Sequence, residues 1–183
     1  VTVTVNALPA LTVTNPVAVC SPSTVSIVQI AEAGYTFTYY ESDQTTILTN
    51  PATIAASGTF YITKTDDATS CVSDLEEVTV TVNALPTLTV TNPVAVCEPN
   101  TVSIEQTAEV GYTFTYYEND QITNVANPAA IDASGTFYIT KTDNITSCLS
   151  DFEAVTVTVN ALPALTVTNP VAVCEPNTVS IVQ

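Results

Sequence analysis

The 183-residue chain contains no histidine, methionine or tryptophan, and its only cationic side chains are Lys64 and Lys141. Without histidine, the Ser-His and Cys-His pairs of nucleophilic catalysis and histidine-ligated metal sites cannot form. The 18 acidic residues give a net charge of −16, and phosphate binding needs clustered Lys and Arg. Nucleic acid and anionic membrane surfaces are therefore poor partners. Without these catalytic groups, we expect a segment that is not an enzyme. No apolar run reaches the roughly 18 residues of a membrane span, so we also expect that the segment does not insert into a membrane.

The chain is rich in internal repetition. Residues 1–77 and residues 78–154 differ at 18 of 77 positions, and the motif VTVTVNALP begins at Val1, Val78 and Val155. A period of this length, longer than a short solenoid unit, predicts domains in tandem. We expect a closing strand of a preceding repeat at 1–9, complete repeats at 10–86 and 87–163, and the start of a further, truncated repeat at 164–183.

Alternation of apolar and polar residues predicts short strands, and helical periodicity is absent. The alternating runs in the first repeat lie at 11–14, 24–30, 35–41, 59–65 and 78–82. Pro, Asn, Gly and Ser lie between them, where turns are expected. The sequence therefore predicts an all-β protein whose repeats are antiparallel β-sandwiches of about seven strands each.

The two copies also predict which face of a strand is buried. Val25 and Ile27 recur unchanged in the second copy, whereas Val28 becomes Glu105 and Ile30 becomes Thr107. An outward position tolerates a charge and a core position does not, so Val25 and Ile27 are expected to point inward. By the same alternation, the strand at 78–82 buries its valines and exposes its threonines.

Five cysteines follow the same period. Cys20, Cys97 and Cys174 are 77 residues apart, as are Cys71 and Cys148, and their spacing matches no CxxC-type zinc pattern. Small domains are commonly stapled, so we predict intradomain disulfides of Cys20 with Cys71 and of Cys97 with Cys148, with Cys174 pairing outside the sequence. Disulfides predict an exported protein.

A resemblance to a known family rests on two segments of the repeat. Residues 56–62 (ASGTFYI) resemble the strand-F signature of immunoglobulin domains, with Phe60 at the tyrosine-corner position and Ile62 at that of the usual cysteine. Tyr39 and Tyr40 lie where strand C would carry its Trp. Together with the late cysteine and the closing VTVTVN-LP, the repeat is similar to the immunoglobulin-like repeats of very large cell-surface proteins of the Bacteroidetes, including gliding-motility adhesins and other cargo of type IX secretion. The resemblance implies tandem immunoglobulin-like domains arranged as a rod.

Short joints link the repeats. Only residues 83–86 and 160–163 separate the last strand of one repeat from the first strand of the next, and proline restricts the backbone there. We expect stiff joints, with Leu85 and Leu162 in interdomain contacts. Each repeat should lengthen the rod by roughly 35 to 45 Å.

Three other features leave alternatives open. Acidic residues near the second cysteine of each repeat form either a solvated rim or weak calcium sites. These residues are Asp66, Asp74, Glu76, Asp143, Asp151 and Glu153. No other cofactor is expected. Lys64 and Lys141 either end in water at a frayed strand end or form Lys-Asn isopeptide crosslinks. The differences between copies at residues 42–55 mark either a ligand-contacting surface or ordinary loop drift.

These expectations favour a non-catalytic stalk of a long secreted adhesin or filament, extracellular and at the cell surface, which gives reach and attachment and serves gliding motility in the family that it resembles. Its partners would be neighbouring repeats in the same chain and other filament chains, besides an unidentified surface ligand. Two alternatives remain: a glycan- or protein-binding module, and the subunit of an extracellular fibre joined by strand exchange.

Overall fold

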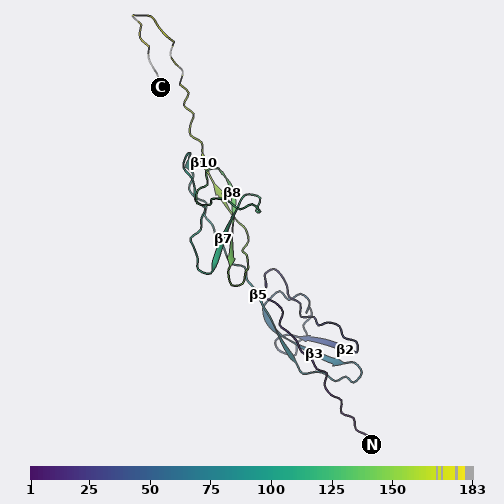
Figure 1. Ribbon diagram of the computed structural model, residues 1–183. Coiled ribbons are helices and arrows are strands. Elements are labelled where there is room, and N and C mark those ends of the chain that lie inside the picture. Colours follow the sequence, from purple (N-terminus) through teal and green to yellow (C-terminus); the bar gives the residue numbers. More distant parts are fainter. Residues whose placement is uncertain (168, 170, 176, 180–183) are drawn as a thin grey trace.

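The computed structural model describes residues 1–167, 169, 171–175 and 177–179. The remaining residues belong to the segment 164–183, so part of the expected truncated repeat lies outside the described residues. Two β-structured units lie end to end, with the N-terminal segment leaving one end of the pair and the C-terminal segment the other (Figure 1). In the described part of the chain, no helix has the length and apolar character needed to cross a membrane.

Each unit contains the same five strands. The strands of the first unit are β1 (Val19–Cys20), β2 (Tyr35–Tyr40), β3 (Gly58–Asp66), β4 (Glu76–Val80) and β5 (Val82–Asn83). The strands of the second unit are β6 (Val96–Cys97), β7 (Tyr112–Tyr117), β8 (Gly135–Asp143), β9 (Glu153–Val157) and β10 (Val159–Asn160).

Each unit is an immunoglobulin-like sandwich of two layers, and its named strands lie in one of them. In the first unit, β2, β3 and β4 form an antiparallel sheet in that order, and β1 pairs in parallel with β5, which follows β4 after a single residue. The opposite layer is held by an antiparallel bridge between Val25 and Ile54, whose backbone groups exchange hydrogen bonds of 2.9 and 2.8 Å. The second unit repeats this arrangement with Val102 and Ile131.

The structure corrects the expected number and direction of strands. Five strands per unit form ladders among the described residues, and one of the pairs is parallel. Residues 11–14 and 24–30 form no named strand. Leu11 and Val13 nevertheless pack against the core, and the Asn15 carboxamide oxygen accepts a 2.8 Å hydrogen bond from the Thr79 amide. A side chain thus holds this segment to β4, which explains why alternation predicts the buried face but not the ladder.

The core lies between the two layers and confirms the predicted faces. Val25 and Ile27 are buried, whereas Val28 and Ile30 are exposed. In β4, Val78 and Val80 are buried and Thr79 is exposed. Ile62, at the position of the usual immunoglobulin cysteine, is fully buried, and Tyr39 packs against the same cluster. Burial of this alternating face is the main favourable contribution to the stability of each unit.

The structure also corrects the expectation that the lysine ends in water. Lys64 is only 8% exposed, and its ammonium lies 2.6 Å from the Glu32 carboxylate and 4.0 Å from the centroid of the Tyr35 ring. Lys141 makes the same contacts with Glu109 and Tyr112. A buried ammonium needs a compensating charge, and the carboxylate supplies it. The lysine therefore contributes to each core through an ion pair and a cation–π contact.

Replacing Ile62 should show how far each unit depends on its core. We expect Ile62→Ala to lower the free energy of unfolding by about 2–4 kcal/mol, because it removes a fully buried side chain and leaves a cavity. Ile30→Ala is the matched control, since Ile30 is 92% exposed, and should change stability by less than about 0.5 kcal/mol. Urea unfolding followed by circular dichroism measures both. Equal effects would contradict the assigned faces.

Candidate functional site: the joint between the units

The first cysteine of each unit lies where the closing strand leaves that unit. Cys20 ends β1 and is in register with Asn83, the last residue of β5. The Ser21 amide donates a 2.9 Å hydrogen bond to the Asn83 carbonyl, which continues the parallel pairing. Because β1 and β5 run in the same direction, both end at the joint. Cys20 is therefore positioned directly at the entry to the next unit.

The second cysteine lies at the opposite end of its unit, in the loop between the last two strands of the three-stranded sheet, which are β3 and β4 in the first unit and β8 and β9 in the second. In the second unit, the Asp143 amide donates a 2.9 Å hydrogen bond to the Cys148 carbonyl. The Asp143 carboxylate accepts hydrogen bonds from the Ile145 and Thr146 amides, which closes the turn. The Thr146 amide, followed by that of Ile145, lowers the pKa of Asp143. This ionised turn residue fixes the loop that carries Cys148.

A disulfide joins Cys20 of the first unit to Cys148 of the second, with a Cα–Cα distance of 5.6 Å. The structure thus corrects the predicted pairs Cys20–Cys71 and Cys97–Cys148. Strand geometry gives the reason: Cys20 lies beside Asn83, beyond the Gly58 end of β3, and Cys71 follows the Asp66 end. The nine residues of β3 span roughly 26–30 Å, whereas bridged Cα atoms lie within about 7 Å.

The polypeptide linker lies against the second unit beside the disulfide. Residues 85–89 line a small cavity together with Ser150, Asp151 and Glu153. Leu85 is partly buried there, as expected of an interdomain contact, whereas Leu162 is 58% exposed and makes no such contact among the described residues. The Lys141 ammonium also lies 3.5 Å from the Thr87 carbonyl. The backbone and the disulfide therefore connect the two units, and Lys141 holds Thr87, the first residue of the second repeat, to its own unit.

The disulfide closes an unusually long loop of 128 residues. In the chain-entropy description, a crosslink of this length stabilises the folded state by about 5 kcal/mol, because it restricts the unfolded chain. Both units lie largely within the loop. Their folding and their relative orientation are therefore coupled by one covalent bond.

The structure does not gather the acidic residues into an evident metal site. Asp66 and Asp143 close turns through backbone hydrogen bonds, Asp74 and Asp151 are exposed, and Glu76 and Glu153 are partly buried at the start of β4 and β9. Among the described residues, no group of three or more His, Cys, Asp or Glu side chains could hold a metal ion. Calcium binding stays an untested expectation from the sequence.

The variable segment 42–55 contributes to an open groove in the first unit. The groove has a volume of about 480 Å³, and its lining comes from residues 41–42, 48–50 and 53–60. Asp43, at the tip of this segment, accepts hydrogen bonds from the Thr46 hydroxyl at 2.6 Å and from the Thr45 and Thr46 amides. These hydrogen bonds lower the pKa of Asp43 to about 2, and the bond from the Thr46 hydroxyl has the largest effect. This turn lies outside the groove lining and connects two of its lining segments, residues 41–42 and 48–50.

Comparisons with known proteins add fold likeness only. No protein family matches the chain, and no curated protein matches it. Among solved structures, one similar chain is the Ig1-2 module of the Drosophila receptor protein tyrosine phosphatase DLAR, with 8% identity and a TM-score of 0.31 over 82% of this chain and 97% of that one. Sidekick-1 immunoglobulin domains 1-4 are similar with 8% identity and a TM-score of 0.31 over 87% of this chain and 48% of that one. The human desmocollin-1 ectodomain is similar with 8% identity and a TM-score of 0.25 over 87% of this chain and 42% of that one. The immunoglobulin-like assignment rests on the sheet topology described above.

Counting thiols in the oxidised chain tests the pairing across the joint. We expect three alkylated cysteines under denaturing, non-reducing conditions, namely Cys71, Cys97 and Cys174, because one disulfide occupies the other two. Mass spectrometry of the alkylated chain gives the number, and peptide mapping gives the bond. Cys20→Ser should leave four thiols, and the control Cys71→Ser should leave two. A single thiol in the unmodified chain would instead support intradomain bridges.

The turn at Asp43 predicts a pH dependence with a definite sign. Its folded-state pKa of about 2 lies below the ordinary value of 3.8, so its stabilising effect is present above pH 3.8 and is lost as the pH falls through about 2. We therefore expect Asp43→Asn to show a smaller loss of melting temperature between pH 4 and pH 2 than the unmodified chain, measured by circular dichroism.

Asp74→Asn is the control for this pH series. Asp74 is exposed, and its carboxylate accepts no hydrogen bond from the described residues. This variant should retain the full decrease in melting temperature between pH 4 and pH 2. A decrease in Asp43→Asn as large as in Asp74→Asn would contradict the role assigned to the Asp43 turn.

Proposed function

We propose that this chain is a section of a non-catalytic extracellular stalk, built from immunoglobulin-like repeats with the boundaries 10–86 and 87–163. The observation that carries the proposal is the joint, where a three-residue connection between Asn83 and Thr87 is doubled by the disulfide between Cys20 and Cys148. A hinge between independent domains needs slack, and this joint has little. The arrangement suits a protein whose task is to hold a fixed reach.

Charge and redox chemistry support a location outside the cell. Disulfides persist in oxidising compartments, and one lies at the joint. The net charge of −16 keeps parallel chains apart and soluble. The similarity of the repeat to those of large Bacteroidetes surface proteins extends the proposal to a secreted adhesin or filament, exported by type IX secretion, that contributes to attachment and gliding.

A second candidate function, a glycan- or protein-binding module, is favoured by the groove beside residues 42–55. The groove is open to solvent, and the two copies differ most in this segment. Such a module would bind a surface polysaccharide or protein as an isolated chain. Calorimetric titration of the chain with polysaccharide from the source cells distinguishes the two functions, because the stalk requires no such affinity.

Immunogold labelling of intact source cells tests the stalk directly. An antibody raised against residues 10–163 should label intact cells, with gold particles lying away from the outer envelope because the repeats hold their epitopes at a distance. Permeabilised cells serve as the control for total protein. Label confined to permeabilised cells, or lying flat on the envelope, would contradict the proposal.

A further inference from the structure

Two of the three unpaired cysteines, Cys71 and Cys97, occupy the same positions in their units as the bonded Cys148 and Cys20 occupy in theirs. Cys97 ends β6 in register with Asn160, as Cys20 ends β1 in register with Asn83. Cys71 accepts a 2.9 Å hydrogen bond from the Asp66 amide, as Cys148 does from that of Asp143. Each unit therefore presents one cysteine of each kind in an unchanged backbone setting.

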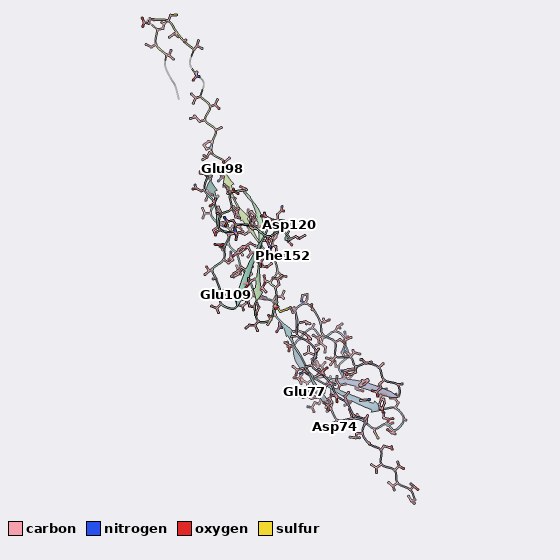
Figure 2. All side chains as sticks on the ribbon, viewed as in Figure 1. Asp74, Glu77, Glu98, Glu109, Asp120 and Phe152 are labelled. Carbon is pink, nitrogen blue, oxygen red and sulfur yellow. A yellow bond between two sulfur atoms is a disulfide. The ribbon has the colours of Figure 1, made fainter. Side chains whose placement is uncertain are left out.

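The two kinds of cysteine lie at opposite ends of every unit. Asp74, three residues after Cys71, lies at the end of the first unit that faces the N-terminal segment (Figure 2). Glu98, next to Cys97, lies at the end of the second unit from which the C-terminal segment departs (Figure 2). Cys71 and Cys97 thus stand at the two outer ends of the pair, where further repeats would join.

Solvent exposure supports the comparison. Cys148, which is bonded, is fully buried, whereas its counterpart Cys71 is only partly buried. Cys20, which is bonded, is partly buried, whereas its counterpart Cys97 is exposed. Since the local backbone is the same, the adjoining unit and the disulfide account for the difference.

We infer that Cys71 and Cys97 each form the same disulfide with a neighbouring repeat, so that the first cysteine of every repeat joins the second cysteine of the next. The pairing rule is the 128-residue separation seen between Cys20 and Cys148. Each bond forms from two thiols, which pass two electrons and two protons to a disulfide oxidant such as oxidised glutathione, itself reduced to two thiols. The inference rests on the proposed stalk for the presence of adjoining repeats.

Such a series of disulfides between successive repeats, here called the disulfide ladder, changes the route that tension takes through the stalk. Cys71 and Cys97 are 26 residues apart, as are Cys148 and Cys174, and each of these segments runs from the far end of one repeat, through the joint, to the far end of the next. By the pairing rule, Cys97 bonds to the second cysteine of the following repeat, so segments that begin two repeats apart join into one covalent path, and two such paths run along the stalk. The 50 residues between the first and second cysteine of each repeat lie outside these paths.

The segment from Cys71 to Cys97, which would carry the tension, is already close to its extended length in the folded chain. Twenty-six residues reach at most roughly 86–94 Å, and two folded repeats span about 70–90 Å. Unfolding the rest of a repeat therefore adds at most roughly 12 Å per repeat while the disulfides are intact. The ladder makes the stalk inextensible without requiring mechanically strong domains.

A chain lengthened by one repeat tests the pairing rule. Residue 183 corresponds to residue 106, so appending residues 107–163 after Gln183 completes a third repeat with a second copy of Cys148. We expect two disulfides, Cys20 with Cys148 and Cys97 with the appended cysteine, and two thiols, at Cys71 and Cys174. Non-reducing peptide mapping and alkylation followed by mass spectrometry give both numbers.

Two variants of the lengthened chain complete the test. Cys97→Ser should lose the second disulfide alone and show three thiols, whereas the control Cys71→Ser should keep both disulfides and show one thiol. Three disulfides without a thiol, four thiols, or Cys97 bonded between separate chains would each overturn the inference. None of these outcomes bears on the immunogold result, so failure of the ladder is distinguishable from failure of the stalk.

Stretching single molecules of the native repeat array tests the path of tension. With disulfides intact, the ladder limits the extension to about 50 Å per repeat, whereas intradomain bridges would allow about 95 Å. After reduction, both arrangements extend to about 250–280 Å per repeat. An oxidised array that reaches the intradomain value would overturn the ladder.

Discussion

The parallel pairing of the first strand with the last strand is the constraint on which the rest of the structure depends. Because β1 runs beside β5 in the same direction, the residues that end both strands meet at the exit of the unit. The antiparallel β3 and β4 then carry their connecting loop to the opposite end. A cysteine at each of these places cannot bond within its own unit but meets its counterpart across a joint.

The scarcity of cations gives each lysine a defined place. One lysine per repeat is buried against a glutamate and a tyrosine ring, and Lys141 also reaches the carbonyl of Thr87 at the joint. Each glutamate side chain is about half exposed (51% and 48%), so water screens the ion pair and its contribution to stability is modest. Other carboxylates, such as those of Asp43 and Asp66, accept amide hydrogen bonds in turns. The acidic composition therefore includes several structural acceptors.

Predictions from the sequence succeeded where they rested on side-chain periodicity. Alternation, with the substitution of Val28 by Glu105, identified the buried face that includes Val25 and Ile27, and turn residues separated the strands. Alternation predicted too many β-strands, because residues 11–14 are held partly by a hydrogen bond to the Asn15 side chain and not by strand pairing. It also placed the Lys64 ammonium in water, since nothing in the local pattern indicated that Glu32, far away in the sequence, would lie beside it.

The sequence by itself determined the period of 77 residues, the all-β class, the faces of the strands and the presence of two recurring cysteines per repeat, because each of these is written in local spacing. Only the tertiary structure decided which cysteines bond, which carboxylate neutralises each lysine and how the linker lies against the next unit. Those outcomes depend on strand direction and on the register between distant segments. Local spacing cannot specify them, since a residue 51 positions away can lie at the far end of the same sandwich while one 128 positions away lies within bonding distance.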